Sequence, residues 1–160
     1  MFNTILYGKD PANPRVARLP PNRPERLNAI APGMPAEIHQ AVALANADDD
    51  VHVIVVQGAG RAFCAGYDLD DVDKLTSSVE QALRLQGRVS GVVVRMGRCP
   101  QPVLGLIQGA ACGGGFALAL GCDVRYAAPN ARMNVAMAKI GLTGCDMGIS
   151  YFLPRAAGPA

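Results

Sequence analysis

The sequence lacks an apolar run long enough to span a membrane, and its N-terminal stretch MFNTILYGKDPANPR has none of the features of a secretory signal peptide. It also lacks an excess of charge of either sign. The formal net charge is +2, and the densest basic cluster, RPER at 23–26, has the composition of a solvated turn. We therefore expect a cytoplasmic protein that binds neither membranes nor nucleic acid.

Paired cysteines are absent as well. The chain has five cysteines, an odd number, with no CxxC pair, and most of them lie among apolar residues. Buried, reduced thiols are therefore expected rather than a disulfide framework or a zinc site, and no metal site of another kind is expected.

Two nucleotide-binding motifs are missing too. GAGRAF follows a β-branched run, but the third glycine position of the dinucleotide fingerprint GxGxxG holds Phe63, and no helix pattern begins there. No glycine is followed by Lys and then Ser or Thr, so the chain has no Walker A sequence. A flavodoxin-like nucleotide-binding protein is set aside because it would need such a phosphate loop.

The composition that remains is that of a globular protein. The 160 residues suffice for one domain, and 50% of them are hydrophobic and 18% charged. Strand and helix patterns alternate along the chain, which predicts an α/β fold with a largely parallel sheet. Strands are expected within 51–60, 101–109 and 122–128, and helices within 34–50, from 79 in the amphipathic stretch 71–99, and within 114–121.

Two glycine-bearing turns follow buried strands: FCAGYDL at 63–69 and GAACGGGF at 109–116. The carboxyl ends of parallel strands lie along one edge of a sheet, so each turn could direct one backbone N–H at a common ligand atom. Two converging N–H groups, one of them at a helix N-terminus, would form an oxyanion hole. For each turn alone, the simpler interpretation is that glycine permits a tight connection.

Several segments occur together in an order that resembles the crotonase superfamily, the enoyl-CoA hydratases and isomerases. They are NRPERLNAI, GAGRAFCAGYDL, QPVLGLIQGAACGGGFALALGCDVRYAA and IGLTGCDMG followed by FLPR. The resemblance extends from about Pro24 to Arg155 and implies a spiral of ββα units, the ClpP/crotonase fold. It also implies an acyl-CoA thioester as substrate. Because family members continue into helices that build trimers, we expect residues 1–160 to be a single crotonase-like core domain, incomplete at its C-terminus and without the helical trimerisation region.

The resemblance also implies site residues. The backbone N–H groups of Tyr67 and Gly114 would form the oxyanion hole that stabilises an enolate, and side chains at Gly113–Gly115 would crowd the thioester. Asp68 has the position of an N-cap for a helix beginning near Leu69, a role that we favour over catalysis. The residues that would border the CoA substrate are Arg26, Leu27, Ala65, Gly66, Tyr67, Asp68, Gly113 and Gly114.

The family pattern fails at the two glutamates that hydratases use, because their positions hold Ala117 and Met137 here. Neither side chain can transfer a proton, so the two-glutamate hydration mechanism does not apply to this chain. Asp146 stands where some dienoyl-CoA isomerases of the superfamily carry an aspartate, and it could act as a lone acid/base. Equally, it could be the N-cap of the helix that CDMGISYFL predicts.

Two smaller expectations concern the rest of the chain. Pro20 and Pro21 interrupt a strand that is usually unbroken in the family, so that strand must be short or lie at a sheet edge. His39 and His52, in a surface-like helix and at a strand start, are expected to be solvated or capping rather than catalytic.

Two functions follow from these observations. The first is an enzyme of the enoyl-CoA hydratase type, a lyase or isomerase of fatty acid metabolism, whose reaction is isomerisation or another acyl-CoA reaction. The second is a non-catalytic acyl-CoA-binding or truncated, inactive homologue. No cofactor is expected, because coenzyme A is part of the substrate. A homotrimer or hexamer is expected only if the C-terminal region is present.

Overall fold

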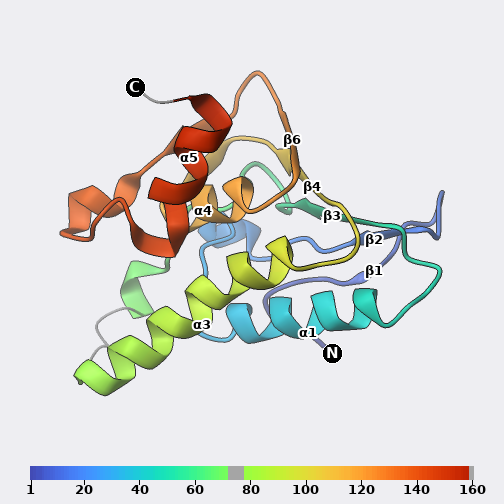
Figure 1. Ribbon diagram of the computed structural model, residues 1–160, viewed down its shortest axis with the longest axis horizontal. Helices are drawn as coiled ribbons and strands as arrows, with labels where there is room; N and C mark the ends of the chain where they lie inside the picture. The colour runs from blue at the N-terminus through green and yellow to red at the C-terminus, as the bar shows by residue number, and fades with distance from the viewer. Residues whose placement is uncertain (72–77, 159–160) are drawn as a thin grey trace.

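The computed structural model describes residues 1–71 and 78–158, which build a five-stranded sheet in the order β1-β2-β3-β4-β6 and a two-stranded sheet, β5-β7 (Figure 1). β1 runs antiparallel to β2, and the other neighbouring strands are parallel, as the alternating pattern predicts. The strands are β1 Gly8–Lys9, β2 Val16–Arg18, β3 Val53–Gln57, β4 Val103–Ile107, β5 Ala110–Cys112, β6 Val124–Ala127 and β7 Arg132–Asn134.

The helices agree with the sequence patterns in position, with shifted ends. The amphipathic helix expected from residue 79 begins there, where the Ser78 hydroxyl accepts a hydrogen bond from the Gln81 N–H at 3.2 Å. The part of that stretch at 72–77 lies outside the described residues. The helices are α1 Met34–Asn46, α3 Val79–Gly97, α4 Gly114–Leu120 and α5 Ile149–Ala157, with 3₁₀ helices η1 Pro24–Arg26, η2 Ala136–Ile140 and η3 Asp146–Gly148.

The strand that precedes the two prolines is short, as expected, but it is not at an edge. β2 ends at Arg18 and lies between β1 and β3 in the sheet. The Leu19 N–H still donates to the Val55 carbonyl at 2.8 Å, and Pro20, which has no N–H, follows directly. The sheet therefore tolerates the prolines because pairing stops just before them.

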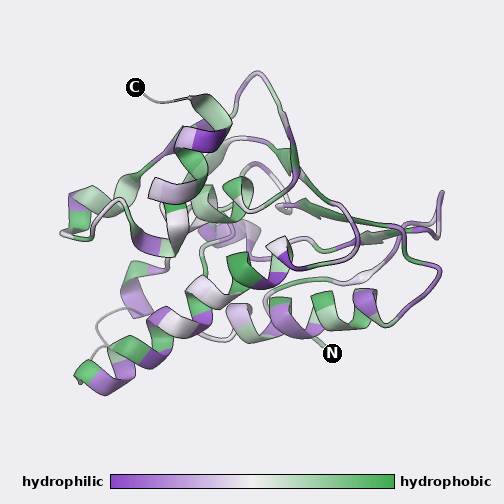
Figure 2. Cartoon of the chain, in the orientation of Figure 1, coloured by the Kyte–Doolittle hydropathy of each residue, from purple (hydrophilic) through white to green (hydrophobic). Residues whose placement is uncertain are grey.

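α1 and α3 lie side by side and cover one face of the sheet (Figure 1). Figure 2 shows hydrophobic residues along the strands and alternating hydrophobic and hydrophilic bands along α3. Gly91 of α3 lies at this contact, where an added Cβ would lie 3.3 Å from His39 Nε2 of α1. The same nitrogen lies 3.4 Å from the Arg88 carbonyl oxygen, in a contact that is open to solvent. His39 is half-buried and His52 is exposed.

The glycine-rich segment contains an element that its sequence did not indicate. Ala110–Cys112 forms β5, which pairs with β7 and is bridged to Cys64. Gly109 (φ 56°) and Gly113 (φ 52°) lie at its two ends, in a region of backbone conformation that favours glycine. β5 therefore leads directly into α4, and this fixes where α4 begins.

Candidate functional site

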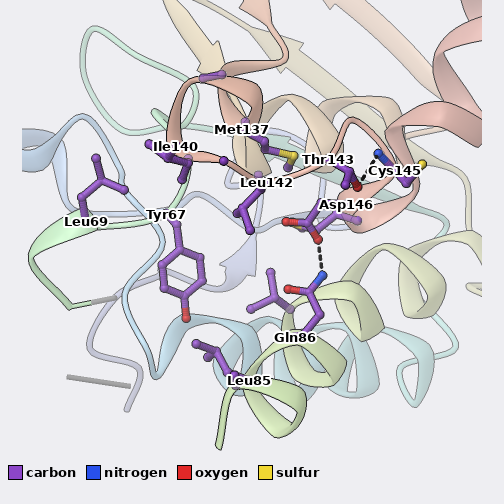
Figure 3. A pocket seen from close by; sticks show the side chains of 18 of the residues that line it. Tyr67, Leu69, Leu85, Gln86, Met137, Ile140, Leu142, Thr143, Cys145 and Asp146 are labelled. Atoms are coloured by element: carbon purple, nitrogen blue, oxygen red, sulfur yellow. Dashed lines mark hydrogen bonds between the residues drawn. The ribbon is translucent and has the colours of Figure 1, made fainter. Parts of the chain in front are cut away.

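A cavity of about 740 Å³ opens between the first half of α3, the loop before residue 69, the start of α4 and the segment that contains η2 and η3 (Figure 3). Its walls are mostly apolar. Among the described lining residues, Asp146 carries the one carboxylate. The lining residues are Ala65, Gly66, Tyr67, Leu69, Val79, Ala82, Leu83, Leu85, Gln86, Val89, Gly113, Gly114, Ala136, Met137, Ile140, Gly141, Leu142, Thr143, Cys145, Asp146 and Met147.

The loop that carries Tyr67 is held by a parallel bridge to Ile30. The Ile30 N–H donates to the Gly66 carbonyl at 2.7 Å, and the Asp68 N–H donates to the Ile30 carbonyl at 3.1 Å. In such a bridge, the N–H of the intervening residue points away from the partner segment. Within the described chain, no acceptor is hydrogen-bonded to the Tyr67 N–H, so this donor is available to a ligand.

Three glycines lie at the start of α4, and the structure constrains each of them differently. Gly113 has a φ of 52° and a ψ of −120°, a conformation that side chains disfavour. A Cβ on Gly114 would lie 3.0 Å from Ile30 Cδ1 and 3.1 Å from Met147 Sδ, and a Cβ on Gly115 would lie 2.0 Å from the Cys64 carbonyl oxygen. The sequence suggested that side chains here would crowd a thioester, but at Gly114 and Gly115 the nearest obstacles belong to the protein.

The structure brings the Tyr67 loop and the start of α4 together. An added Cβ on Gly66 would lie 3.5 Å from the Gly114 nitrogen, and both segments line the same cavity. Gly114 is the first residue of α4, where backbone N–H groups have no partner within the helix. In the described part of the chain its N–H has no other acceptor, so two unpaired donors from separate loops border one cavity.

The side chain of Tyr67 contributes differently from its backbone. Its hydroxyl oxygen is buried and has no hydrogen-bond partner among the described residues. Burial, with the Asp71 carboxylate as a lesser cause, raises the pKa of Tyr67 to about 12, so the phenol stays protonated at neutral pH. Figure 3 shows the ring with its hydroxyl directed toward Leu85 of α3.

Three of the residues expected to border CoA lie outside the cavity lining: Arg26, Leu27 and Asp68. They contact one another and the loop that carries Tyr67. The Ala65 N–H donates to the Leu27 carbonyl at 3.0 Å, and Arg26 Nη2 donates to Asp68 Oδ1 at 2.8 Å. Arg23 Nη1 lies 3.0 Å from the other Asp68 oxygen. The two guanidinium groups hold the pKa of the Asp68 carboxyl below its ordinary value, with Arg26 the larger cause.

Asp68 directly precedes the helical residues 69–71, the position expected for an N-cap. Its side chain is 4% exposed, and each of its oxygens contacts an arginine. Asp68 and Asp70 also raise the pKa of Arg26. The structure therefore gives Asp68 a buried ion-pair role that the sequence pattern did not indicate.

Asn28 is a structural residue that sequence reasoning missed. It is fully buried with a φ of 57°, and its amide donates to the carbonyl oxygens of Ala59 at 2.8 Å and Ala62 at 2.7 Å. Its side-chain oxygen accepts from the Arg23 N–H at 2.9 Å. These bonds tie the turn around η1 to the loop after β3. Left-handed Asn conformations are a known signal of tight turns, but NRPERLNAI alone does not show which residue adopts one.

Asp146 is half-buried in the cavity wall and does not cap a helix. The N-cap residues of η3 and α5 are Cys145 and Gly148, and neither helix start has a side-chain cap. Instead, the Asp146 carboxylate accepts a hydrogen bond through Oδ1 from the Gln86 amide of α3 (Figure 3). The capping alternative for Asp146 is therefore not supported by the geometry.

The two positions aligned with hydratase glutamates both hold buried apolar residues, but only one of these residues lines the cavity. Met137 is 5% exposed and lines the cavity, whereas Ala117 is fully buried in α4 outside the lining. Neither brings an ionisable group to the cavity. Within the described residues, Asp146 is the lining side chain that can act as a carboxylate base.

The cysteines are all free thiols. Burial raises the pKa of Cys64 and of Cys122 to about 12, so both are inert at neutral pH, whereas Cys145 is exposed and lines the cavity. In residues 1–71 and 78–158, no group of His, Cys, Asp and Glu side chains is arranged to hold a metal ion. No helix in the same part of the chain is both long and apolar enough to cross a membrane.

Comparison with known proteins identifies the class to which this fold and cavity belong. Residues 12–160 match the family model for enoyl-CoA hydratase/isomerase, and the chain belongs to that family. A crystal structure of a probable enoyl-CoA hydratase/isomerase from Mycobacterium abscessus superposes with a TM-score of 0.87 at 38% identity, covering 98% of this chain and 59% of that one. The crotonase fold is thereby confirmed.

Curated relatives match over most of this chain. "Probable enoyl-CoA hydratase echA12" of Mycobacterium bovis is 38% identical over 151 residues, which cover 91% of this chain and 53% of the relative. The 1,2-epoxyphenylacetyl-CoA isomerase of Escherichia coli is 38% identical over 141 residues, which cover 87% of this chain and 53% of the isomerase. The chain thus spans about half the length of these curated relatives.

Proposed function

We propose that the protein acts on an acyl-CoA thioester and transfers a proton through an enolate intermediate. The N–H groups of Tyr67 and Gly114 bind the thioester oxygen, and Asp146 removes a proton from the acyl α-carbon. The electron pair of the broken C–H bond becomes the enolate double bond, and the negative charge passes to the thioester oxygen. Return of the proton to the γ-carbon of an unsaturated acyl chain shifts the double bond, which is an isomerisation.

One observation carries this proposal: two unpaired backbone N–H groups and a single carboxylate border the same largely apolar cavity. Removing one hydrogen-bond donor from a known oxyanion hole, there an asparagine side chain, costs about 2.7–4 kcal/mol. The effect of such donors is strong when water is excluded, and the apolar walls provide such surroundings. The same walls, on α3 and around Leu142, suit an apolar acyl group.

The apolar residues at the two positions where hydratases of the family have glutamates favour isomerisation over hydration. Hydration needs one group to activate water and another to protonate the α-carbon, whereas a proton shift needs only one acid/base. Ala117 and Met137 supply no such group, and Asp146 supplies one. The names of the relatives do not decide between the two reactions, because a probable hydratase and an isomerase are each 38% identical to this chain.

The test follows α-proton exchange. Butyryl-CoA incubated with the protein in D₂O should gain deuterium at its α-carbon, measured by mass spectrometry, and crotonyl-CoA should not be hydrated. Asp146→Asn should lower the exchange rate by at least about 100-fold, the contribution typical of a positioned acid/base. Asp49→Asn removes an exposed carboxylate after α1 and serves as the matched control, with exchange unchanged.

The second candidate is an acyl-CoA-binding protein without turnover, proposed because both glutamate positions are apolar and the chain spans about half of its relatives. Calorimetry with butyryl-CoA separates the two candidates. Binding with Asp146-dependent exchange supports the enzyme, and binding without any exchange supports the second candidate. Absence of binding by folded protein would contradict both.

The remaining proposals concern the residues around the substrate, the cofactor, the cellular location and the oligomeric state. Arg26, Leu27 and Asp68 act by supporting the Tyr67 loop, and the CoA moiety contacts Ala65, Gly66, Tyr67, Gly113 and Gly114. Coenzyme A enters as part of the substrate, and no separate cofactor takes part. Location in the cytoplasm and assembly into trimers or hexamers stay predictions for the longer, family-length protein.

A further inference from the structure

Gln86 and Asp146 meet across the cavity from elements 60 residues apart in the chain. Gln86 lies on α3, on the part of the helix that lines the cavity, and Asp146 lies at the start of η3. The Gln86 amide nitrogen donates to Asp146 Oδ1 (Figure 3). It also donates to the Ser90 hydroxyl oxygen at 3.2 Å. Both amide hydrogens of Gln86 are thereby used, which fixes the orientation of the amide group.

The other carboxylate oxygen of Asp146 has a different environment. No group in the described part of the chain donates a hydrogen bond to Oδ2. Met147, the next residue, packs near Gly114, where an added Cβ would lie 3.1 Å from its sulfur. Asp146 is thus anchored through one oxygen, next to the residues that border the start of α4, while the second oxygen is not engaged.

We propose that Gln86 is the positioning residue for Asp146 in the proton transfer. This inference rests on the proposed function. The amide holds Oδ1, so that Oδ2 is presented in one orientation to the α-carbon of the bound thioester. A carboxylate held by a hydrogen bond has far fewer orientations than a free one. A displacement of about 1 Å between the reacting groups can lower the rate of proton transfer about 100-fold.

The chemical type of the donor matters as much as its place. An Arg or Lys in contact with Asp146 would stabilise the anion strongly and make it a weaker base. A neutral amide orients the carboxylate without adding a positive charge, so the group stays able to take a proton and give it back. Gln86 does not touch the reacting atoms in this scheme and acts only through Asp146.

A purely structural role for Gln86 would have a different signature. The contact also ties α3 to η3, so its loss could loosen the cavity wall and weaken substrate binding whether or not Asp146 is present. A positioning role instead lowers the turnover rate with little change in KM, and only while Asp146 is present to be positioned.

A double-mutant cycle on the full chain separates these roles, with butyryl-CoA deuterium exchange as the assay. Gln86→Met has similar length and no donor, and it should lower kcat for exchange by about 10- to 100-fold with KM changed less than about 2-fold. In the Asp146→Asn background the same change should have no further effect. Gln86→Glu, which cannot donate when ionised, should lower kcat at least as much. Gln40→Met makes the same change at an exposed glutamine of α1 outside the cavity lining and is the control, with kcat within about 2-fold of wild type.

The outcomes distinguish this inference from the proposed function. If Asp146→Asn abolishes exchange while Gln86→Met and Gln86→Glu retain the wild-type kcat, the positioning role is refuted and the proposed function stands. An equal loss for Gln86→Met with and without Asp146, or a loss seen only in KM, also refutes it and assigns Gln86 a structural role. If the wild-type chain binds butyryl-CoA and catalyses no exchange, the proposed function fails, and the role of Gln86 with it.

Discussion

Among single residues, Gly115 has the least room for change. It lies in the first turn of α4 and faces the Cys64 backbone, where an added Cβ would lie 2.0 Å from the carbonyl oxygen and 2.7 Å from the carbonyl carbon. Backbone atoms cannot move aside as a flexible side chain can. α4 and the segment before Tyr67 are therefore packed at a distance that only glycine allows.

Gly115→Ala should consequently destabilise the fold by about 2–3 kcal/mol, the upper part of the range for overpacking. The matched control is Gly87→Ala on α3, where an added Cβ would meet no atom of residues 1–71 and 78–158 within 4 Å. That change should stabilise the chain by about 0.5–1 kcal/mol, because alanine favours a helix interior more than glycine does. Urea unfolding followed by circular dichroism measures both. Equal stability of Gly115→Ala and wild type would show that α4 can move away from Cys64.

Between elements, the important link is the buried pairing of Asp68 with the arginines around η1. It fixes the Tyr67 loop relative to the N-terminal turn, together with the Ile30 bridge. Removing the charge of Asp68 would leave Arg23, 21% exposed at its side chain, without its partner. Removing one partner of a buried ion pair lowers the free energy of unfolding by more than the intact pair contributes to it, because the remaining charge stays partly buried.

Asp68→Asn should therefore lower the free energy of unfolding at neutral pH by about 2 kcal/mol, as for hydrogen bonds to charged groups. The folded-state pKa of Asp68 lies below its unfolded value, so its ionised form stabilises the fold above about pH 4 and this stability is lost as the pH falls further. The difference between wild type and variant should thus shrink below pH 4. Urea titrations at several pH values measure it, and a difference that stays constant down to pH 2 would contradict the assignment.

The elements that the sequence predicted are those with a clear periodicity. β3 and β4 coincide with β-branched or apolar runs, β6 lies within the expected strand 122–128, and the hydrophobic repeat of α3 marks its face toward the core. β5 and β7 were missed because three residues, in one case Ala-Ala-Cys, are too short to show an alternating pattern. The break between η3 and α5 was also missed. Met147 adopts a φ of 50° there, and a methionine in the sequence gives no indication of a left-handed backbone conformation.

Across the whole molecule, the cavity is assembled from segments that are distant in sequence. The glycine turns could be placed together because both follow parallel strands, and the structure confirms that both line one cavity. Gln86 could not be found in this way. It lies on the amphipathic stretch of α3 among exposed polar residues, and only the tertiary fold shows that this turn of the helix faces Asp146. Helix periodicity predicts the face toward the core, but not which polar residue borders a cavity.

The distribution of cysteines allows occupancy of this cavity to be measured without any turnover. Cys145 is exposed in the cavity wall, whereas Cys64 and Cys122 are buried and their thiols have pKa values of about 12. At pH 8, iodoacetamide should therefore modify Cys145 in the folded protein and leave Cys64 and Cys122 unmodified until the chain unfolds, as peptide mass spectrometry would show.

Saturating butyryl-CoA should slow modification of Cys145 by at least about 10-fold, since a bound ligand removes nearly all of the free site at high occupancy. Free coenzyme A, which lacks the acyl group, serves as the control for binding outside the cavity and should protect less. The Cys145→Ser variant identifies the modified peptide. Because this readout needs neither Asp146 nor catalysis, it applies equally to an enzyme and to a binding protein. An unchanged rate of Cys145 modification, at a butyryl-CoA concentration where calorimetry records binding, would place the acyl group elsewhere and remove the physical basis for proton transfer by Asp146.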